Sequence, residues 1–268
     1  IDAATILSKE QITANDLNKL EANLYDFTNQ IYVQTLFRKD FALSVGFEHK
    51  HLKIDSETIN KENSDDDFTF ENSNYLSLFG GLKFDTYSDK YFPKSGLYFD
   101  GDFHLYFYSS DFNNTFSEFS IAKAKMGFAQ SVSPKFSFNI ETEGGFKIGD
   151  DTTPYLDFAL GGYGNDLINN LIPFYGYDFI SLTGDSFVKA KLHLDYEIFK
   201  KHHLLALFNM ANVDDDLFES GNWITSPDFV GYGLGYSLES FLGPIELKYT
   251  YSPETKRDIW FFNLGFWF

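Results

Sequence analysis

Two stretches of this chain hold part of a serine nucleophile site, and both are incomplete. A serine hydrolase places its nucleophile on a Gly-x-Ser-x-Gly elbow between a strand and a helix. Residues 184–188 read Gly-Asp-Ser-Phe-Val, which lacks the second glycine, and Asp100-Gly101 has the form of a dyad aspartate but falls within a predicted strand. We therefore expect no catalytic residues here and no ester hydrolysis by this chain itself.

Histidines and aspartates also cluster, but without the spacing of a metal site. His49 and His51 share one face of a strand end, where a metal would need a carboxylate that the sequence does not place. Residues 214–216 are aspartates, but the spacing and central glycine of a calcium loop are absent, which favours a solvated loop. His202-His203 could contact lipid phosphate or form a solvated turn, and the turn is favoured. We expect no metal and no cofactor.

The clearest pattern is an alternation of polar and apolar side chains along residues 186–198. The polar set is Lys189, Lys191, His193, Asp195 and Glu197, and the apolar set is Val188, Ala190, Leu192, Leu194, Tyr196 and Ile198. A helix would mix these sets, whereas a strand places them on opposite faces. The pattern recurs at 95–108, 136–148 and 245–251, and more weakly at 27–37, 41–52, 74–87, 116–131, 203–213 and 229–241.

The last ten residues form an aromatic strand with one apolar face. That face carries Trp260, Phe262, Leu264, Phe266 and Phe268. It suits the final strand of a bacterial outer-membrane barrel, with Phe266 and Phe268 in the aromatic girdle at the periplasmic interface. A terminal Phe with a second aromatic two residues earlier also resembles the sorting signal that the outer-membrane assembly machinery reads. The alternative is a core strand of a soluble sandwich.

The composition fits strands that face lipid on one side and water on the other. Aromatic residues make up 19% of the 268 residues, yet the mean hydropathy is −0.26. No apolar run is long enough for a transmembrane helix. A net charge of −18 excludes nucleic acid as a partner, and the lack of cysteine fits an oxidising periplasm. The start, Ile-Asp-Ala-Ala, indicates a processed chain or a piece of a longer one.

Connection lengths alternate in the way that outer-membrane barrels show. The connections assigned to the periplasm are short, at 38–40, 133–135, 200–202 and 242–244, and several assigned to the outside are long and acidic, at 53–72, 149–185 and 214–228. The expected fold is therefore all-β: a transmembrane antiparallel β-barrel of about twelve strands. We expect one barrel domain over 1–268, in which 1–26 is a strand plus a loop or short helix, and 149–185 is a long extracellular loop.

Two motifs resemble the bacterial surface-antigen barrel superfamily, which includes outer-membrane protein insertases and two-partner secretion transporters. Residues 85–96 read Asp-Thr-Tyr-Ser-Asp-Lys-Tyr-Phe-Pro-Lys-Ser-Gly and resemble one of its hairpins. Residues 158–162, Phe-Ala-Leu-Gly-Gly, and 172–177, Ile-Pro-Phe-Tyr-Gly-Tyr, resemble its extracellular loop that folds into the lumen. The resemblance implies about sixteen strands, so either four N-terminal strands are missing here or the barrel is reduced.

One departure from the superfamily lies in the lumenal loop motif. The resemblance implies Val-Arg-Gly at the positions where this chain has Phe174, Tyr175 and Gly176, followed by Tyr177. The ionic latch of that arginine is thus replaced, and Tyr175 could donate a hydrogen bond to Asp195 or Glu197. Gly176 indicates a positive φ or a close backbone approach. The polar face of 186–198 should line the lumen. Its charges either neutralise one another or form the surface on which this loop docks.

A narrower resemblance points to patatin-like phospholipases of the Bacteroidetes group. It rests on Leu-Gly-Gly-Tyr-Gly-Asn at 160–165, the 172–177 motif, Leu-Asp-Tyr-Glu-Ile-Phe at 194–199 and the Phe-Trp-Phe ending. It implies an outer-membrane barrel that anchors or secretes a phospholipase whose catalytic domain lies outside this sequence. The alternatives are an insertase or polypeptide transporter with a weakly paired seam, and a diffusion pore. Expected partners are outer-membrane lipid and the assembly machinery; the oligomeric state is left open.

Overall fold

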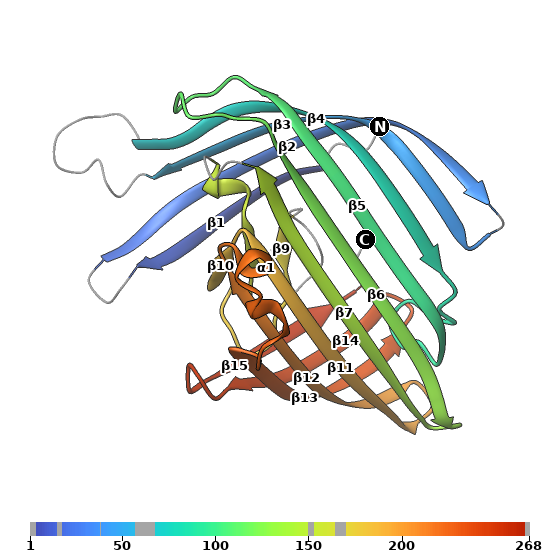
Figure 1. The fold of residues 1–268 in the computed structure, drawn as a ribbon. Helices are drawn as coiled ribbons and strands as arrows, with labels where there is room; N and C mark the ends of the chain where they lie inside the picture. The colour runs from blue at the N-terminus through green and yellow to red at the C-terminus, as the bar shows by residue number, and fades with distance from the viewer. Residues whose placement is uncertain are drawn as a thin grey trace.

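The computed structural model describes residues 4–14, 18–37, 39–56, 68–149, 153–163 and 170–265. Within these residues, twelve strands form one sheet, in the order β1 (Ala4–Ala14), β2 (Asn18–Phe37), β3 (Phe41–Ser56), β4 (Phe68–Asp85), β5 (Ser95–Ser109), β6 (Phe119–Ser133), β7 (Phe136–Gly149), β11 (Ser186–Phe199), β12 (His202–Asp214), β13 (Phe229–Ser240), β14 (Gly243–Ser252) and β15 (Arg257–Leu264). Each strand pairs antiparallel with the next, and the sheet curls around a central space (Figure 1). The fold is an antiparallel β-barrel.

The alternation in the sequence predicted these strands correctly. The segment 186–198 is β11, which ends at Phe199, and 136–148 is β7, which ends at Gly149. Residues 13–26 were open to a helix or a loop, and here the structure corrects the expectation: β1 extends to Ala14 and β2 begins at Asn18. The long strand β2 pairs with β3 from Asn23 to Phe37, which extends the sheet beyond the predicted start at residue 27.

The sheet is apolar outside and polar inside. On the outer face Ile31 is 79% exposed and Val33 is 75% exposed, whereas Glu48 and Lys50 on the inner face are each 2% exposed. A soluble protein would not expose so many large apolar side chains, but a barrel surrounded by lipid must. Among the described residues, no helix has the length and apolar character needed to cross a membrane.

A small sheet interrupts the succession of wall strands between β7 and β11. It contains β8 (Phe158–Leu160), β9 (Leu171–Ile172) and β10 (Leu182–Gly184), in the order β10-β8-β9, after the short helix η2 (Pro154–Leu156). Phe158 and Leu160 are almost fully buried in one cluster with Tyr106 and Phe187 of the wall strands. The described parts of this segment, 153–163 and 170–185, therefore pack on the inner face of the wall, and we call them the inner loop.

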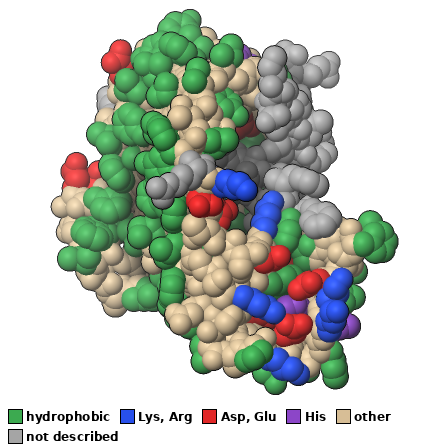
Figure 2. All heavy atoms as spheres, turned by 90° about the vertical axis from the view of Figure 1, so that its right-hand side faces the viewer, with side chains coloured by type: hydrophobic (Ala, Val, Ile, Leu, Met, Phe, Trp, Pro, Cys, Tyr) green, Lys and Arg blue, Asp and Glu red, His purple; other side chains and the backbone are tan. Residues whose placement is uncertain are grey.

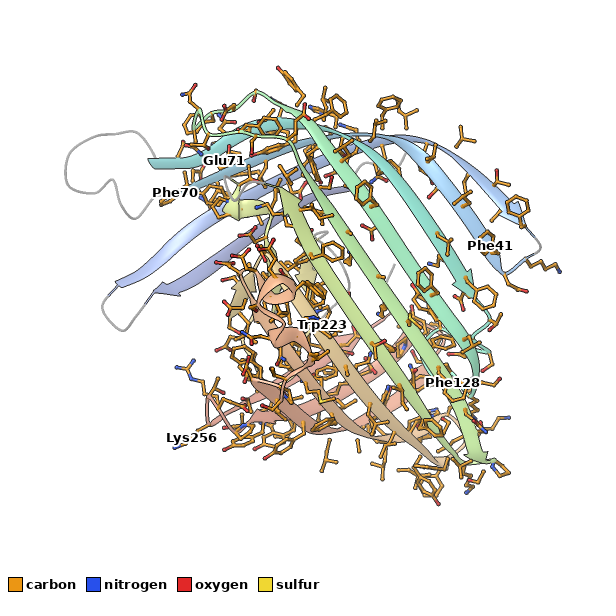
Figure 3. The ribbon with its side chains drawn as sticks, viewed as in Figure 1. Phe41, Phe70, Glu71, Phe128, Trp223 and Lys256 are labelled. Atoms are coloured by element: carbon orange, nitrogen blue, oxygen red, sulfur yellow. The ribbon has the colours of Figure 1, made fainter. Side chains whose placement is uncertain are left out.

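The wall has two distinguishable ends. Figure 3 shows Phe41, at the start of β3, near one end of the sheet and Glu71 and Lys256 near the other. Residues 86–94, which we call the hairpin, connect β4 to β5 at the end of Phe41, because Phe41 pairs with Phe84. Figure 2 views this end: hydrophobic side chains cover much of the surface, and charged side chains gather in its lower half. The helices α1 (Leu217–Ser220) and η3 (Asn222–Ile224) lie in the β12–β13 connection at the opposite end.

Candidate functional site

The backbone of Tyr175 is the point where the inner loop is fixed to the wall. The Tyr175 N–H donates to Asn209 Oδ1 at 2.8 Å, and Asn209 Nδ2 donates back to the Tyr175 carbonyl oxygen at 3.3 Å. Asn209 belongs to β12 and is buried. On the neighbouring strand, Gly231 leaves the space for this carbonyl, because a Cβ atom at residue 231 would overlap it. The Asn209 amide thus holds the Tyr175 peptide, and the absence of a side chain at Gly231 leaves room for it.

The residues on either side of Tyr175 complete this contact. Gly176 has a φ of +86°, which confirms the positive value expected from the sequence, and a Cβ atom there would lie 2.8 Å from the Tyr251 carbonyl oxygen. Phe174 is fully buried in the core of the inner loop. The Tyr177 hydroxyl donates to Glu254 at 2.9 Å, and burial, the largest cause, raises the pKa of Tyr177 to about 12. This hydroxyl therefore stays protonated and remains a donor.

A second tyrosine of the inner loop is held by charged groups of β14. The Tyr163 hydroxyl donates to Glu246 and accepts from Lys248 Nζ at 2.7 Å. Its ring stacks on Tyr175 with the ring centres 5.9 Å apart. Burial, and then the neighbouring Tyr175 and Glu246, raise the pKa of Tyr163 far above its usual value, so that it acts as a neutral donor.

The hydrogen bond expected from Tyr175 to Asp195 or Glu197 is not formed in the described structure. Asp195 accepts from His203 Nδ1 at 2.8 Å, and Glu197 pairs with Lys94 Nζ at 2.7 Å. Tyr175 lies with its ring near Lys248 instead, 6.0 Å from Nζ to the ring centre. At this point the inner loop is held by the peptide contact with Asn209.

The hairpin closes on the same wall from the other end. Phe92 stacks on His203 with ring centres 4.1 Å apart, and the Tyr87 hydroxyl donates to Asn139 at 2.9 Å. The hydrogen bond from Lys94 to Glu197 is the largest cause that raises the pKa of that ammonium. The solvated turn expected at His202-His203 is wrong for His203, which is fully buried, because strand alternation turns it inward under Phe92.

Ion pairs join the inward charges of neighbouring strands. They include Lys50–Asp26 at 2.9 Å, Lys189–Glu143 at 2.7 Å, Lys191–Glu141 at 2.7 Å and Lys125–Glu141 at 3.5 Å. Lys189 also donates to the Pro173 carbonyl oxygen of the inner loop at 3.2 Å. On the polar face of β11, Lys191 is held within the wall by an ion pair, whereas Lys189 both pairs within the wall and contacts the loop.

The terminal aromatic residues are only partly described. Trp260, Phe262 and Leu264 of β15 are exposed on one face, as alternation requires. Phe266 and Phe268 lie outside the described residues, so the sorting signal stays a prediction. Sequence reasoning missed Asn209 and Gly231, although the alternation of 203–213 gives the only signal that could have found Asn209, by placing its amide on an otherwise largely apolar inward face.

Comparisons with known proteins agree with this geometry. The profile of the OMP85 superfamily matches residues 1–268. No curated protein matches. Among solved structures, the chain is similar to BamA from Haemophilus ducreyi lacking POTRA domains 1–3, with a TM-score of 0.62 and 11% sequence identity. The match covers 88% of this chain and 52% of that one, so this chain spans about half the length of that BamA chain. At this identity the likeness shows the fold.

The resemblance to the surface-antigen barrels is thereby confirmed, and with it the expected place in the cell, the bacterial outer membrane. The outer apolar face, the inward ion pairs and the profile match over the whole chain lead to one assignment: this chain is an outer-membrane β-barrel that belongs to the OMP85 superfamily.

Proposed function

We propose that this barrel inserts or transports polypeptides at the outer membrane, and that it does so at the edges of its sheet. The observation that carries the proposal is the pair of sheet edges, β1 and β15, and the occupied lumen argues against a diffusion pore. The inner loop is fixed through Tyr175 to Asn209, and its core residues Phe174 and Leu160 are fully buried. A diffusion pore needs a free water path, and this lumen is filled from one side by the loop and from the other by the hairpin.

The edge strands supply the place where a substrate could pair. In the described structure, β1 pairs with β2 over eleven residues, β15 pairs with β14 over eight, and these two strands are the edges of the sheet. The outer N–H and C=O groups of an edge strand need partners, and at membrane depth water does not supply them. A guest strand that adds to either edge satisfies these groups by β-augmentation.

Disulfide trapping tests whether a guest strand pairs at a sheet edge. The chain contains no cysteine, so any disulfide must form through the cysteine that is introduced. Phe262→Cys places a thiol on the edge strand β15, and Ile140→Cys places one on the central strand β7, with both side chains exposed on the outer face. The purified barrel in vesicles is mixed with an unfolded outer-membrane protein that carries one cysteine in its last strand. We expect the mixed disulfide at residue 262 and not at residue 140. Equal yields at both positions would contradict the seam.

The second candidate function is the membrane anchor of a patatin-like phospholipase. The motifs at 160–165 and 172–177 favour it, because they carry the narrower resemblance and supply Tyr163 and Tyr175, which fix the loop in the lumen. A barrel whose lumen is occupied by the inner loop suits an anchor as well as a transporter. The reading frame upstream of Ile1 decides: a Gly-x-Ser-x-Gly elbow, with phospholipase activity in outer membranes that contain the full gene product, supports the anchor. Its absence leaves the polypeptide transporter.

We also propose that the inner loop enters from the outside of the cell and the hairpin from the periplasm, as the connection lengths indicate. Lys256, in the β14–β15 turn, is exposed and lies at the same end of the wall as Glu71, so Lys256→Cys places a thiol there. The Lys256→Cys variant should react with a membrane-impermeant maleimide on intact cells. The Lys39→Cys variant, in the exposed β2–β3 turn at the hairpin end, should react only after the outer membrane is opened. The reverse labelling would invert the topology.

A further inference from the structure

The connection between β12 and β13, residues 215–228, lies against the outer face of the wall. Strand alternation points Met210 and Asn212 to that face. Met210 is 37% exposed, but Asn212 is only 4% exposed. The Asn212 amide donates to the Asn222 carbonyl oxygen at 3.0 Å and accepts from the Asp228 N–H at 2.8 Å. An outward side chain of β12 is therefore covered by this connection, which we call the outer connection.

Aromatic rings make a second contact between the outer connection and the wall. Phe146 of β7 belongs to the same outward set as Ile140 and Ile148, and all three are exposed. Phe218 of α1 packs edge-to-face on Phe146, with ring centres 5.2 Å apart, and Trp223 of η3 packs on Phe218 at 5.6 Å. These rings form a continuous apolar surface that begins on the lipid-facing wall and ends at Trp223 (Figure 3).

The backbone of the outer connection is held by its own hydrogen bonds. The Ser220 N–H donates to the Asp216 carbonyl oxygen at 3.0 Å, and the Thr225 N–H donates to the Asn222 carbonyl oxygen at 3.2 Å. The Asp216 N–H donates to the Asp185 carboxylate at 3.1 Å. Backbone groups near a bilayer need such partners, because water becomes scarce toward the hydrocarbon. These bonds also fix the direction in which the apolar side chains of the connection point.

Two large apolar side chains of the outer connection stay exposed. Trp223 is 42% exposed and Ile224 is 73% exposed. The acidic side chains Asp215, Asp216 and Glu219 are exposed as well, but they come before η3 in the chain. An exposed apolar patch of this kind marks a contact with a partner or a membrane. Tryptophan is favoured at the membrane–water interface, because its ring is apolar and its N–H is polar.

We propose that the outer connection is an interfacial membrane anchor, whose Trp223 and Ile224 side chains insert among outer-membrane lipids at the edge of the hydrocarbon layer. Lipid is the occupant because the patch continues an established interface. Phe146, on which the connection packs, lies on the outward apolar face of a membrane barrel. Such an anchor fixes how deeply this end of the wall lies in the membrane. The inference does not depend on polypeptide handling, and only the choice of the outer leaflet rests on the proposed orientation.

Spin labelling tests the proposal, because the chain contains no cysteine and each variant carries a single label. Ile224→Cys and the matched control Glu219→Cys place exposed thiols on the outer connection, and Ile140→Cys places one on the lipid-facing wall. Electron paramagnetic resonance in phosphatidylcholine vesicles compares collisions with oxygen, which concentrates in lipid, and with a nickel chelate, which stays in water. We expect the oxygen-to-nickel collision ratio at residue 224 to match that at residue 140 and to exceed that at residue 219 several-fold.

A second labelled position keeps the test decisive if one variant does not fold. Trp223→Cys should give the same result as Ile224→Cys, and the heat-dependent gel mobility of each variant reports its folding. Nickel collisions as frequent at residues 223 and 224 as at residue 219 would overturn the proposal. Spectral broadening between labels at residue 224, which disappears when labelled chains are diluted with unlabelled chains, would show that a second copy covers the patch. That result would also overturn it.

Discussion

Asn209 shows how one side chain can replace an ionic contact. A primary amide both donates and accepts, so Asn209 satisfies the N–H and the carbonyl oxygen of Tyr175 at once. An arginine has no acceptor and could not do this. The contact is made to backbone atoms, so it holds the loop without depending on the loop side chain. At the scale of single residues, the site is therefore defined by the two residues that contact the Tyr175 peptide, Asn209 and Gly231.

The first prediction concerns this amide. Asn209→Ala leaves the buried Tyr175 N–H without its acceptor, at a cost of about 1–3 kcal/mol. We expect faster hydrogen exchange in residues 170–182, measured by mass spectrometry. Asn212→Ala is the control, because Asn212 holds a different connection, through Asn222 and Asp228. It should raise exchange in 214–228 alone, and equal effects of the two variants on 170–182 would contradict the latch.

The second prediction concerns the space beside that peptide. Gly231→Ala places a Cβ atom where the Tyr175 carbonyl oxygen lies, so the loop or β13 must shift. Overpacking of this kind costs about 1–3 kcal/mol, which should appear as a lower free energy of unfolding in urea. At Gly80 the atoms nearest to a new Cβ lie 3.9 Å away, so Gly80→Ala should change that free energy little. A Gly231→Ala variant as stable as the Gly80 variant would show that the fit is loose.

At the scale of elements, the hairpin and the inner loop are inserts that use the wall in different ways. The inner loop brings its own apolar core, with Phe158 and Leu160 buried against the wall. The hairpin has little core of its own and depends on Phe92, which is buried against His203, with Leu205 and Leu207 in the same cluster. We therefore expect the stability of the hairpin to depend on this aromatic contact more than on its charges.

The third prediction separates these contributions. Phe92→Ala removes the buried ring and should lower the free energy of unfolding by about 3 kcal/mol. Lys94→Gln removes an ion pair whose lysine side chain is 43% exposed, so it should cost no more than about 1 kcal/mol. Urea unfolding of both variants in the same vesicles compares them directly. A larger loss for Lys94→Gln would mean that the charges, and not the ring, hold the hairpin.

The elements were predictable from sequence where lipid and water impose a period of two. That rule gave the strands and the inward direction of Lys189 and His193, because a side chain on the wrong face would meet the wrong solvent. The rule could not give the hydrogen-bond partners of these residues across the lumen. Tyr175 and Asn209 are 34 residues apart, and alternation states which face a residue occupies but not what reaches it from across the lumen. Residues 18–26 were missed as strand because their alternation is weak.

At the scale of the whole molecule, the barrel is a network of backbone hydrogen bonds shielded by lipid. Within the twelve-stranded sheet, every described strand except the edges β1 and β15 pairs on both sides. The fourth prediction follows: the folded chain should resist sodium dodecyl sulfate at room temperature and change its electrophoretic mobility only after heating. Detergent cannot compete for bonds that lie under an apolar surface. Solubility in plain buffer, with no shift on heating, would contradict a membrane barrel.

The position of the hairpin along the chain has a consequence for biogenesis. Lys94 and its partner Glu197 are 103 residues apart, and His203 follows later still. When the polypeptide is made, residues 86–94 exist long before the strands on which they rest. If the barrel is built in chain order, the hairpin can bond to Asn139 of β7 first, and it gains its contacts with β11 and β12 only when those strands are made. The hairpin therefore closes its end of the lumen late in assembly, and a chain that stalls before residue 186 would leave that end open.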